Sequence, residues 1–309
     1  MADMDKPDWA EALKERPFGE QHFTEALKTG IRKRIKRESR RKIRTLPWLL
    51  AAAAAGALIF LLFRMDGMLP LGGQAAERSV YNVNGETRFQ VFPEPELRAG
   101  VQAGYIFRFA APFSEFRGKK LSIAATHLRT GQQADAVRPV EIMEPSSGYE
   151  GLERFTARFA LPLGGLWRYE VALDGERYGD VVLSLSEPSW DISPTFKSGS
   201  YSMRGIEGKV GFIDPGFVAG KANKYLWHFW GEDGELDGEL TVMAVKKGDD
   251  RMIEVFSGSG LGGGVNGADR TLPSMMALPE AGVWRLLPFI DGLLFDSIVV
   301  EVKEDEERS

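Results

Sequence analysis

The stretch "GLWRYEVALDGERYGDVVLSL" (Gly165–Leu185) decides the fold, because the chain repeats its pattern as "GVWRLLPFIDGLLFDSIVVEV" (Gly282–Val302). In the first copy, every second residue from the tryptophan to the Asp-Gly pair is apolar, as in a strand with one face in a core. The Asp-Gly pair of each copy predicts a tight hairpin turn, since glycine accepts the positive φ that such turns require. Each stretch therefore predicts a β-hairpin that begins with a tryptophan.

The repeat extends beyond the two hairpins. Residues 159–187 and 276–304 align at an offset of 117 with ten identities, and "YIFRF" (105–109) matches "YLWHF" (225–229). We interpret the chain as two copies of one module, at 81–187 and 188–304. The residues that define the hairpins are Trp167, Asp174, Gly175, Trp284, Asp291 and Gly292.

Short strand-like runs alternate with turn signals throughout both modules, and no long amphipathic helix occurs in them. This pattern is typical of a β-sandwich. A tryptophan that enters the last hairpin resembles the final two strands of an immunoglobulin-like module. The expected fold is therefore mainly β, with two tandem immunoglobulin-like β-sandwich domains behind a single N-terminal transmembrane helix. Pro288 lacks an N–H for a ladder, which predicts an edge strand or a bulge there.

A membrane segment is predicted from "LPWLLAAAAAGALIFLLF" (46–63), eighteen residues without a charge. As a helix they would extend about 27 Å, enough to cross a hydrocarbon core. A buried Ala-rich helix would normally show a polar face, and a cleaved signal peptide would need a much shorter leader. Because basic residues precede the segment, we expect a cell-membrane protein with a cytoplasmic N-terminus and everything after a stalk (64–80) outside, including an acidic C-terminal end (305–309).

Residues 1–45 carry a net charge of +5 and the rest of the chain −10. An apolar stripe of Leu27, Ile31, Ile35 and Ile43 runs through this tail. One interpretation is a membrane-surface segment that lies on the anionic inner leaflet and fixes topology; the other is a docking helix for a cytoplasmic protein partner. A nucleic-acid partner is not expected, because no recognition motif is present. The basic residues in question are Arg32, Lys33, Arg34, Lys36, Arg37, Arg40, Arg41, Lys42 and Arg44.

Little in the sequence points to catalysis. The chain has no cysteine, which excludes disulfides, thiolate metal sites and a cysteine nucleophile, and its three histidines lie far apart. The Gly-rich "SGSGLGGG" (257–264) lacks the following helix that a phosphate loop needs, so we interpret it as a loop between strands. We expect no enzyme, no catalytic residues, no cofactor, no metal site and no pocket with convergent polar groups.

The aromatic run "KYLWHFWG" (224–231) offers a candidate binding patch, formed by Trp227, His228 and Trp230. Strand alternation places Trp227 in the core face, and His228 and Trp230 on the opposite face. Core packing of the whole run is one interpretation. In the other, His228 and Trp230 form an exposed pair that stacks on a sugar or a peptide.

The segment "WDISPTFKSGSYSMRGIEGKVGFID" (190–214), with the aromatic run after it, resembles an uncharacterised family of two-domain envelope proteins and lipoproteins from Gram-positive bacteria. The resemblance covers about 190–303. It implies an immunoglobulin-like fold and a location outside the membrane, and it implies no activity. The chain departs from the lipoprotein members because it has no cysteine to carry a lipid.

Together these features predict a membrane-anchored, extracytoplasmic, non-enzymatic protein that binds or senses a cell-envelope component. The alternative is a transmembrane regulator of the anti-sigma kind, whose basic tail binds a cytoplasmic partner.

Overall fold

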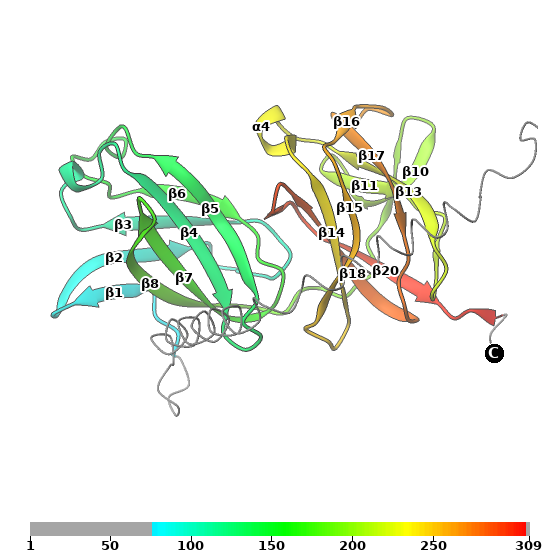
Figure 1. Cartoon of the computed structure of the whole chain (residues 1–309), viewed down its shortest axis with the longest axis horizontal. Coiled ribbons are helices and arrows are strands. Elements are labelled where there is room, and N and C mark those ends of the chain that lie inside the picture. Colours follow the sequence, from blue (N-terminus) through cyan, green and yellow to red (C-terminus); the bar gives the residue numbers. More distant parts are fainter. Residues whose placement is uncertain (1–75, 307–309) are drawn as a thin grey trace, which may run out of the picture. The chain divides into compact units, whose positions relative to one another are not determined.

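The computed structural model describes residues 76–306, and these are mainly β-strand (Figure 1). The helices in this part are short, namely η1 (Phe113–Glu115) and α4 (Asp233–Leu236). The prediction of a mainly β chain is therefore confirmed. The predicted tail, the predicted membrane helix and most of the predicted stalk lie outside the described residues. Within residues 76–306, no helix has the length and apolar character needed to cross a membrane.

The first module consists of two four-stranded sheets, with strand orders β1-β2-β3-β6 and β5-β4-β7-β8. Its strands are β1 (Val80–Val83), β2 (Glu86–Pro93), β3 (Ala103–Phe109), β4 (Lys120–His127), β5 (Gln133–Glu141), β6 (Phe155–Phe159), β7 (Gly165–Leu173) and β8 (Glu176–Leu185). Buried side chains from both sheets form one core, which includes Phe107 from the first sheet and Trp167 from the second. The module is thus a β-sandwich.

The second module repeats this arrangement with extra strands. Its sheets have the orders β16-β17-β13-β11-β10-β9 and β12-β20-β18-β14-β15, and β19 pairs with β18. The order β2-β3-β6 recurs as β11-β13-β17, and β5-β4-β7-β8 recurs as β15-β14-β18-β20. Its strands are β9 (Thr195–Ser198), β10 (Tyr201–Ile206), β11 (Val210–Ile213), β12 (Phe217–Val218), β13 (Asn223–Phe229), β14 (Leu240–Lys246), β15 (Met252–Gly258), β16 (Gly262–Gly263), β17 (Arg270–Met276), β18 (Gly282–Ile290), β19 (Leu293–Leu294) and β20 (Ile298–Lys303).

The hairpins that the sequence singled out have the same geometry in both modules. Asp174 and Gly175 connect β7 to β8 with φ of 52° and 82°, and Asp291 and Gly292 have φ of 49° and 81°. Two successive positive φ angles are those of a type I′ turn, whose twist matches the strands on either side. The two tryptophans are also equivalent, because each indole Nε1 donates to the carbonyl four residues earlier, at 2.8 Å for Trp167 and 2.9 Å for Trp284.

The expectation of an edge strand at Pro288 is wrong, because β18 lies between β14 and β20. Proline is tolerated there because the ladder with β20 ends at Leu286, and the pairing with β19 begins at Phe289. On that side of β18, Pro288 lies between two pairings, so the missing N–H interrupts no ladder.

Candidate functional site

The aromatic run proposed as a binding patch lies in β13 and directly after it, and β13 lies between β17 and β11 within its sheet of the second module. Trp227 faces the core, is fully buried, and donates from Nε1 to Ser274 Oγ at 3.1 Å. His228 and Trp230 occupy the opposite face, as strand alternation predicted. Their rings stack with centroids 6.2 Å apart.

The expected exposed pair is not present, because His228 is 0% exposed and only Trp230 reaches solvent. His228 Nδ1 lies 3.0 Å from the carbonyl oxygen of Leu226 and therefore carries the proton, and Nε2 accepts from Asn266 Nδ2 at 3.1 Å. Burial lowers the pKa of His228 below its usual value. Strand β9 supplies Phe196, whose ring meets that of Trp230 at 5.9 Å. This strand has no counterpart in the first module, so the repeat did not reveal it.

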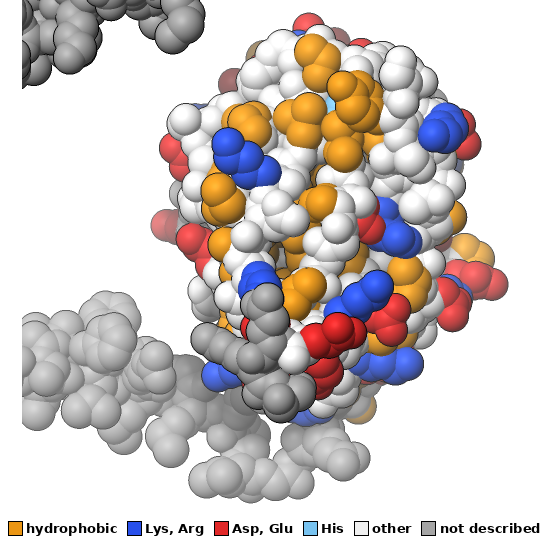
Figure 2. All heavy atoms as spheres, turned by 90° about the vertical axis from the view of Figure 1, so that its right-hand side faces the viewer, with side chains coloured by type: hydrophobic (Ala, Val, Ile, Leu, Met, Phe, Trp, Pro, Cys, Tyr) orange, Lys and Arg blue, Asp and Glu red, His pale blue; other side chains and the backbone are white. Residues whose placement is uncertain are grey.

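The outer face of this sheet is nonetheless an apolar surface. Residues paired across antiparallel strands share a face, so Leu226 lies beside Ile213 and Pro273, and Lys224 lies beside Met275. Figure 2 shows hydrophobic side chains gathered on the side of the molecule that carries β10 and β13. We call this surface the apolar face, and it is formed by Phe196, Tyr201, Ile213, Leu226, Trp230, Pro273 and Met275. Met275 is 53% exposed and Tyr201 is 47% exposed.

The equivalent face of the first module carries arginines beside apolar residues such as Phe92 and Ile106, which pair there. There Gln90 pairs with Arg108, and Gly104 pairs with Arg158. By the repeat, Arg108 corresponds to His228 and Arg158 to Met275. Because one module folds with arginines at these positions, the fold itself does not require apolar residues there. A face of this kind without arginines is therefore a property of the second module.

The other sheet of the second module packs its outer face against the first module. Val245 and Leu287 belong to the same buried cluster as the core of the first module, and Phe289 packs against it. Ion pairs border the contact, between Arg129 and Asp250 at 2.7 Å and between Arg138 and Asp291. An apolar centre with a polar rim is the usual anatomy of a stable interface.

Arg285 lies in the middle of this junction and is 1% exposed. Its Nη2 donates to the carbonyl oxygen of Pro162 at 2.8 Å, and its guanidinium carbon lies 5.0 Å from the ring centroid of Trp190. Nε and Nη1 have no hydrogen-bond partner. Burial lowers the pKa of Arg285 to about 10. The junction thus contains a cation whose lost hydration is only partly replaced.

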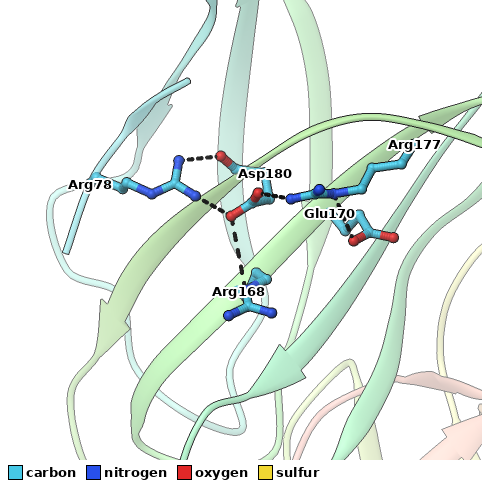
Figure 3. A network of polar contacts seen from close by, with 5 residues as sticks. All are labelled: Arg78, Arg168, Glu170, Arg177 and Asp180. Atoms are coloured by element: carbon cyan, nitrogen blue, oxygen red, sulfur yellow. Dashed lines mark hydrogen bonds and ion pairs between the residues drawn. The ribbon is translucent and has the colours of Figure 1, made fainter. Parts of the chain in front are cut away.

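The position equivalent to Arg285 in the first module has a very different environment. Figure 3 shows Arg168 beside Asp180, which also binds Arg78 and Arg177. Glu170 in turn pairs with Arg177 at 3.2 Å. Backbone hydrogen bonds between residues 78 and 182 join the start of the described chain to β8, next to this cluster. We interpret the cluster as a structural contact that holds the first described residues, around Arg78, against β8.

A cavity is present where the β18–β19 hairpin and α4 meet β5 and β6 of the first module. Carboxylates and guanidiniums from several elements line it, so the prediction of no pocket with convergent polar groups is wrong.

The Gly-rich segment at 257–264 is a connection between strands and not a phosphate-binding loop. It ends β15, forms β16 and leads into β17, and no helix follows it. Within residues 76–306, no group of His, Asp or Glu side chains is placed to hold a metal ion.

Comparisons with known proteins give a domain family and several distant structural likenesses. A comparison with curated proteins gives no match. The structure "X-ray Crystal Structure of a Putative Lipoprotein from Bacillus anthracis" is 24% identical, over 37% of this chain and 87% of that one, with a TM-score of 0.32. The Escherichia coli adhesin FdeC is 10% identical over 72% of each chain, and the bacterial integrin-binding protein invasin is 12% identical over 70% of this chain and 39% of its own. Both have TM-scores of 0.22. Likenesses this distant indicate no function for this chain.

The family comparison coincides with the second module. The resemblance noted in the sequence covered about 190–303, whereas the first module lies almost entirely outside the matched range. Residues 181–300 match the model of a family described as a Domain of unknown function (DUF4871).

Proposed function

We propose that this chain is a non-enzymatic, single-pass membrane protein that holds both modules outside the cell membrane and binds another envelope protein through the apolar face. The anchor and its orientation rest on the uncharged segment at 46–63 and the basic residues before it. We also propose that both modules are immunoglobulin-like. Support comes from the strand order β2-β3-β6 facing β5-β4-β7-β8 and its recurrence in the second module.

The observation that carries the binding proposal is the composition of the apolar face. The solvent side of an antiparallel sheet is normally polar. Among the strand positions that share this face, Lys224 is the single charged residue. Contiguous exposed apolar surfaces of this kind mark interaction sites on soluble domains.

The chemistry of the face favours a protein or peptide over a sugar. A sugar needs hydrogen-bonding groups that are free to turn toward it, but three of the polar side chains of this face form hydrogen bonds within the module. Thr271 Oγ1 donates to the carbonyl oxygen of Gly263, and Trp230 Nε1 donates to that of Gly267. His228 uses both ring nitrogens within the module. The expected partner therefore presents apolar side chains.

The absence of catalysis remains a proposal, and the state of the histidines supports it. His127 is buried, with Nδ1 2.8 Å from Thr130 Oγ1 and Nε2 3.0 Å from the carbonyl oxygen of Gly164. With His228 also engaged at both nitrogens, neither ring is free to act as a base.

Cross-linked capture of the full-length chain from its own membranes tests the proposal. Met275→Asp places a charge in the apolar face, and Phe92→Asp is the matched control, since Phe92 is exposed on the equivalent face of the first module. We expect one envelope protein to be captured by the wild type and by Phe92→Asp, and lost with Met275→Asp. Capture that survives Met275→Asp would contradict the proposal.

A third variant distinguishes the alternative function. Replacing Leu27, Ile31 and Ile35 by Asp disrupts the apolar stripe of the tail. Loss of a cytoplasmic protein with this variant alone, while Met275→Asp changes nothing, would favour the transmembrane regulator.

A further inference from the structure

The free edge of β9 borders the apolar face, since β9 is the last strand of its sheet and supplies Phe196. The N–H of Gly205 donates to the carbonyl oxygen of Pro194 across the pairing of β9 with β10. Hydrogen-bonded and non-hydrogen-bonded pairs alternate along antiparallel strands, so the backbone groups of Phe196 point toward β10. The N–H and C=O groups of Thr195 and Lys197 therefore point away from the sheet.

These edge groups are available to another chain. Thr195 and Lys197 are exposed, and within residues 76–306 their N–H and C=O groups form no backbone hydrogen bond. No proline lies between positions 195 and 198 to block an approaching strand. A row of unpaired backbone donors and acceptors at a sheet edge is a template for a strand from another molecule.

A row of apolar side chains crosses the sheet and ends at this edge. The strand registers join Phe196 to Met203, Met203 to Ile213, Ile213 to Leu226 and Leu226 to Pro273. Residues paired across antiparallel strands share a face, so the row runs along the apolar face. In the part of the chain that the structure describes, no strand lies beyond β9 in this sheet. An apolar side chain on an added strand would continue the row.

The opposite side of the same edge is basic. Side chains alternate along a strand, so Thr195 and Lys197 lie on the face opposite to Phe196. Arg204 is paired with Thr195 on that side, and it is already bound to Asp214 at 2.5 Å. Lys197 forms no ion pair with any residue in 76–306. A strand that adds to β9 can therefore neutralise Lys197 with a carboxylate.

We propose that the partner of the apolar face contributes an extended segment of alternating apolar and acidic residues, which adds an antiparallel strand to β9. The inference rests on the proposed function and specifies how the partner is recognised. The pairings within this sheet are antiparallel, which sets the orientation of the added strand. An apolar residue of the segment lies opposite Phe196 in a non-hydrogen-bonded pair, where side chains approach most closely. Its acidic neighbours lie opposite Thr195 and Lys197.

Other partners match the edge less well. In strand addition, backbone hydrogen bonds supply affinity and the alternate side chains supply specificity. A helix has no free backbone groups along its length, so it would leave the edge groups of Thr195 and Lys197 unpaired. A basic segment would place like charge beside Lys197. A second copy of β9, paired about Phe196, would set Lys197 opposite Thr195 and supply no carboxylate.

Isothermal titration of the full-length chain in detergent micelles, with empty micelles as the blank, tests the inference. The probe is a capped hexapeptide of alternating glutamate and valine. In the proposed pairing its glutamate N–H groups face β9, and its valine N–H groups face solvent. N-methylation of the glutamates should therefore weaken binding about tenfold or more, and N-methylation of the valines by less than about twofold. A hexapeptide of alternating lysine and valine should bind about fivefold or more weakly than the probe.

Two variants at one position separate the backbone from the charge. Lys197→Pro removes an N–H that points to solvent, so it should leave the pairing with β10 intact and weaken binding of the probe about tenfold or more. Lys197→Ala keeps this N–H and removes only the charge, and it should weaken binding about two- to threefold. Thermal unfolding of each variant checks that the fold is retained.

Thr156→Pro in β6, an edge strand of the first module, is the matched control. The N–H of Phe109 donates toward the chain that leads into β6, and alternation then directs the backbone groups of Phe155 and Ala157 toward β3. Thr156 is exposed and its N–H points away from the sheet, as that of Lys197 does. This variant should leave binding of the probe unchanged.

The results separate this inference from the function on which it rests. Absence of binding by the probe, equal binding by the two N-methylated peptides, or unchanged binding in Lys197→Pro would overturn the inference. In the capture experiment, an envelope protein that is lost with Met275→Asp but retained with Lys197→Pro would also overturn it, and would leave the proposed function intact. Capture that survives Met275→Asp would contradict the proposed function itself.

Discussion

At the scale of single residues, the repeat provides matched pairs in which one residue type has two environments. Arg168 and Arg285 occupy equivalent positions, yet Arg168 forms an ion pair with Asp180, whereas Arg285 is 1% exposed and two of its guanidinium nitrogens have no hydrogen-bond partner. His228 replaces Arg108 and is buried under Trp230. Substitutions at such a pair therefore show how the surroundings of a residue change its contribution to the free energy of unfolding.

Arg285→Met should raise the free energy of unfolding by about 1–3 kcal/mol, because an apolar side chain of similar length replaces a buried cation with two unpartnered N–H groups. Arg168→Met should lower it by about 0–1 kcal/mol, because the contact of Arg168 with Asp180 is long, at 3.9 Å, and Asp180 keeps its ion pairs with Arg78 and Arg177. Urea unfolding of both variants measures the difference. Clear destabilisation by Arg285→Met would show that the guanidinium contributes to the junction more than its burial costs.

Acid should destabilise the described unit through its two buried histidines. Burial lowers the pKa of His127 and of His228 below their usual value of about 6.5. Between the lowered pKa and about 6.5, the unfolded chain binds more protons than the folded chain, so the free energy of unfolding falls as the pH is lowered. Urea unfolding at pH 7.5 and pH 5.5 should show this loss, and replacing both histidines by Gln should reduce it. An unchanged dependence in the double variant would assign the effect to other groups.

At the scale of elements, the two hairpins are the features that sequence predicted best. The Asp-Gly turns, the alternation of β7 and the tryptophan at its start are local signals, and local signals decide a hairpin. The extra strands β9 and β16 were missed because they are short and have no counterpart in the first module. Strand alternation alone therefore predicted that His228 could be exposed, whereas it is buried in the structure.

The two Asp-Gly turns have the same geometry, which predicts an equal loss of stability when the glycine of either turn is replaced. Gly175 and Gly292 have φ of 82° and 81°, and a Cβ added to either would meet nothing within 4 Å. Gly175→Ala and Gly292→Ala should therefore each lower the free energy of unfolding by about 1–2 kcal/mol, through backbone strain alone. Gly234→Ala in α4 is the control, since it has free space and no positive φ, and it should be neutral or slightly stabilising. A neutral result at the turns would contradict the assigned turn type.

At the scale of the whole molecule, the sequence predicted two modules but not the contact between them. Residues 76–306 belong to one compact unit, and Leu287 of the second module lies in the same buried cluster as the core of the first. The contact is made by outward-facing residues of β14 and β18, whose apolar character sequence alone cannot distinguish from core packing. The cavity was missed for the same reason, because its lining comes from residues that the sequence separates widely.

The continuous junction predicts that both modules unfold together. Calorimetry of the full-length chain should show one transition for this unit, and Leu287→Asp should split it into two. Leu287 faces away from the core of its own module, so the charge disrupts the junction and leaves each sandwich able to fold. Two transitions in the wild type would show that the junction does not couple the modules.

The central claim is that the apolar face of the second module binds an envelope protein, and site-specific photo-cross-linking in intact cells tests it most directly. A photoreactive residue at position 275 samples that face, and one at position 92 samples the equivalent face of the first module. The account predicts one discrete cross-linked protein from position 275 and none from position 92. No adduct at position 275, or the same adducts from both positions, would contradict it.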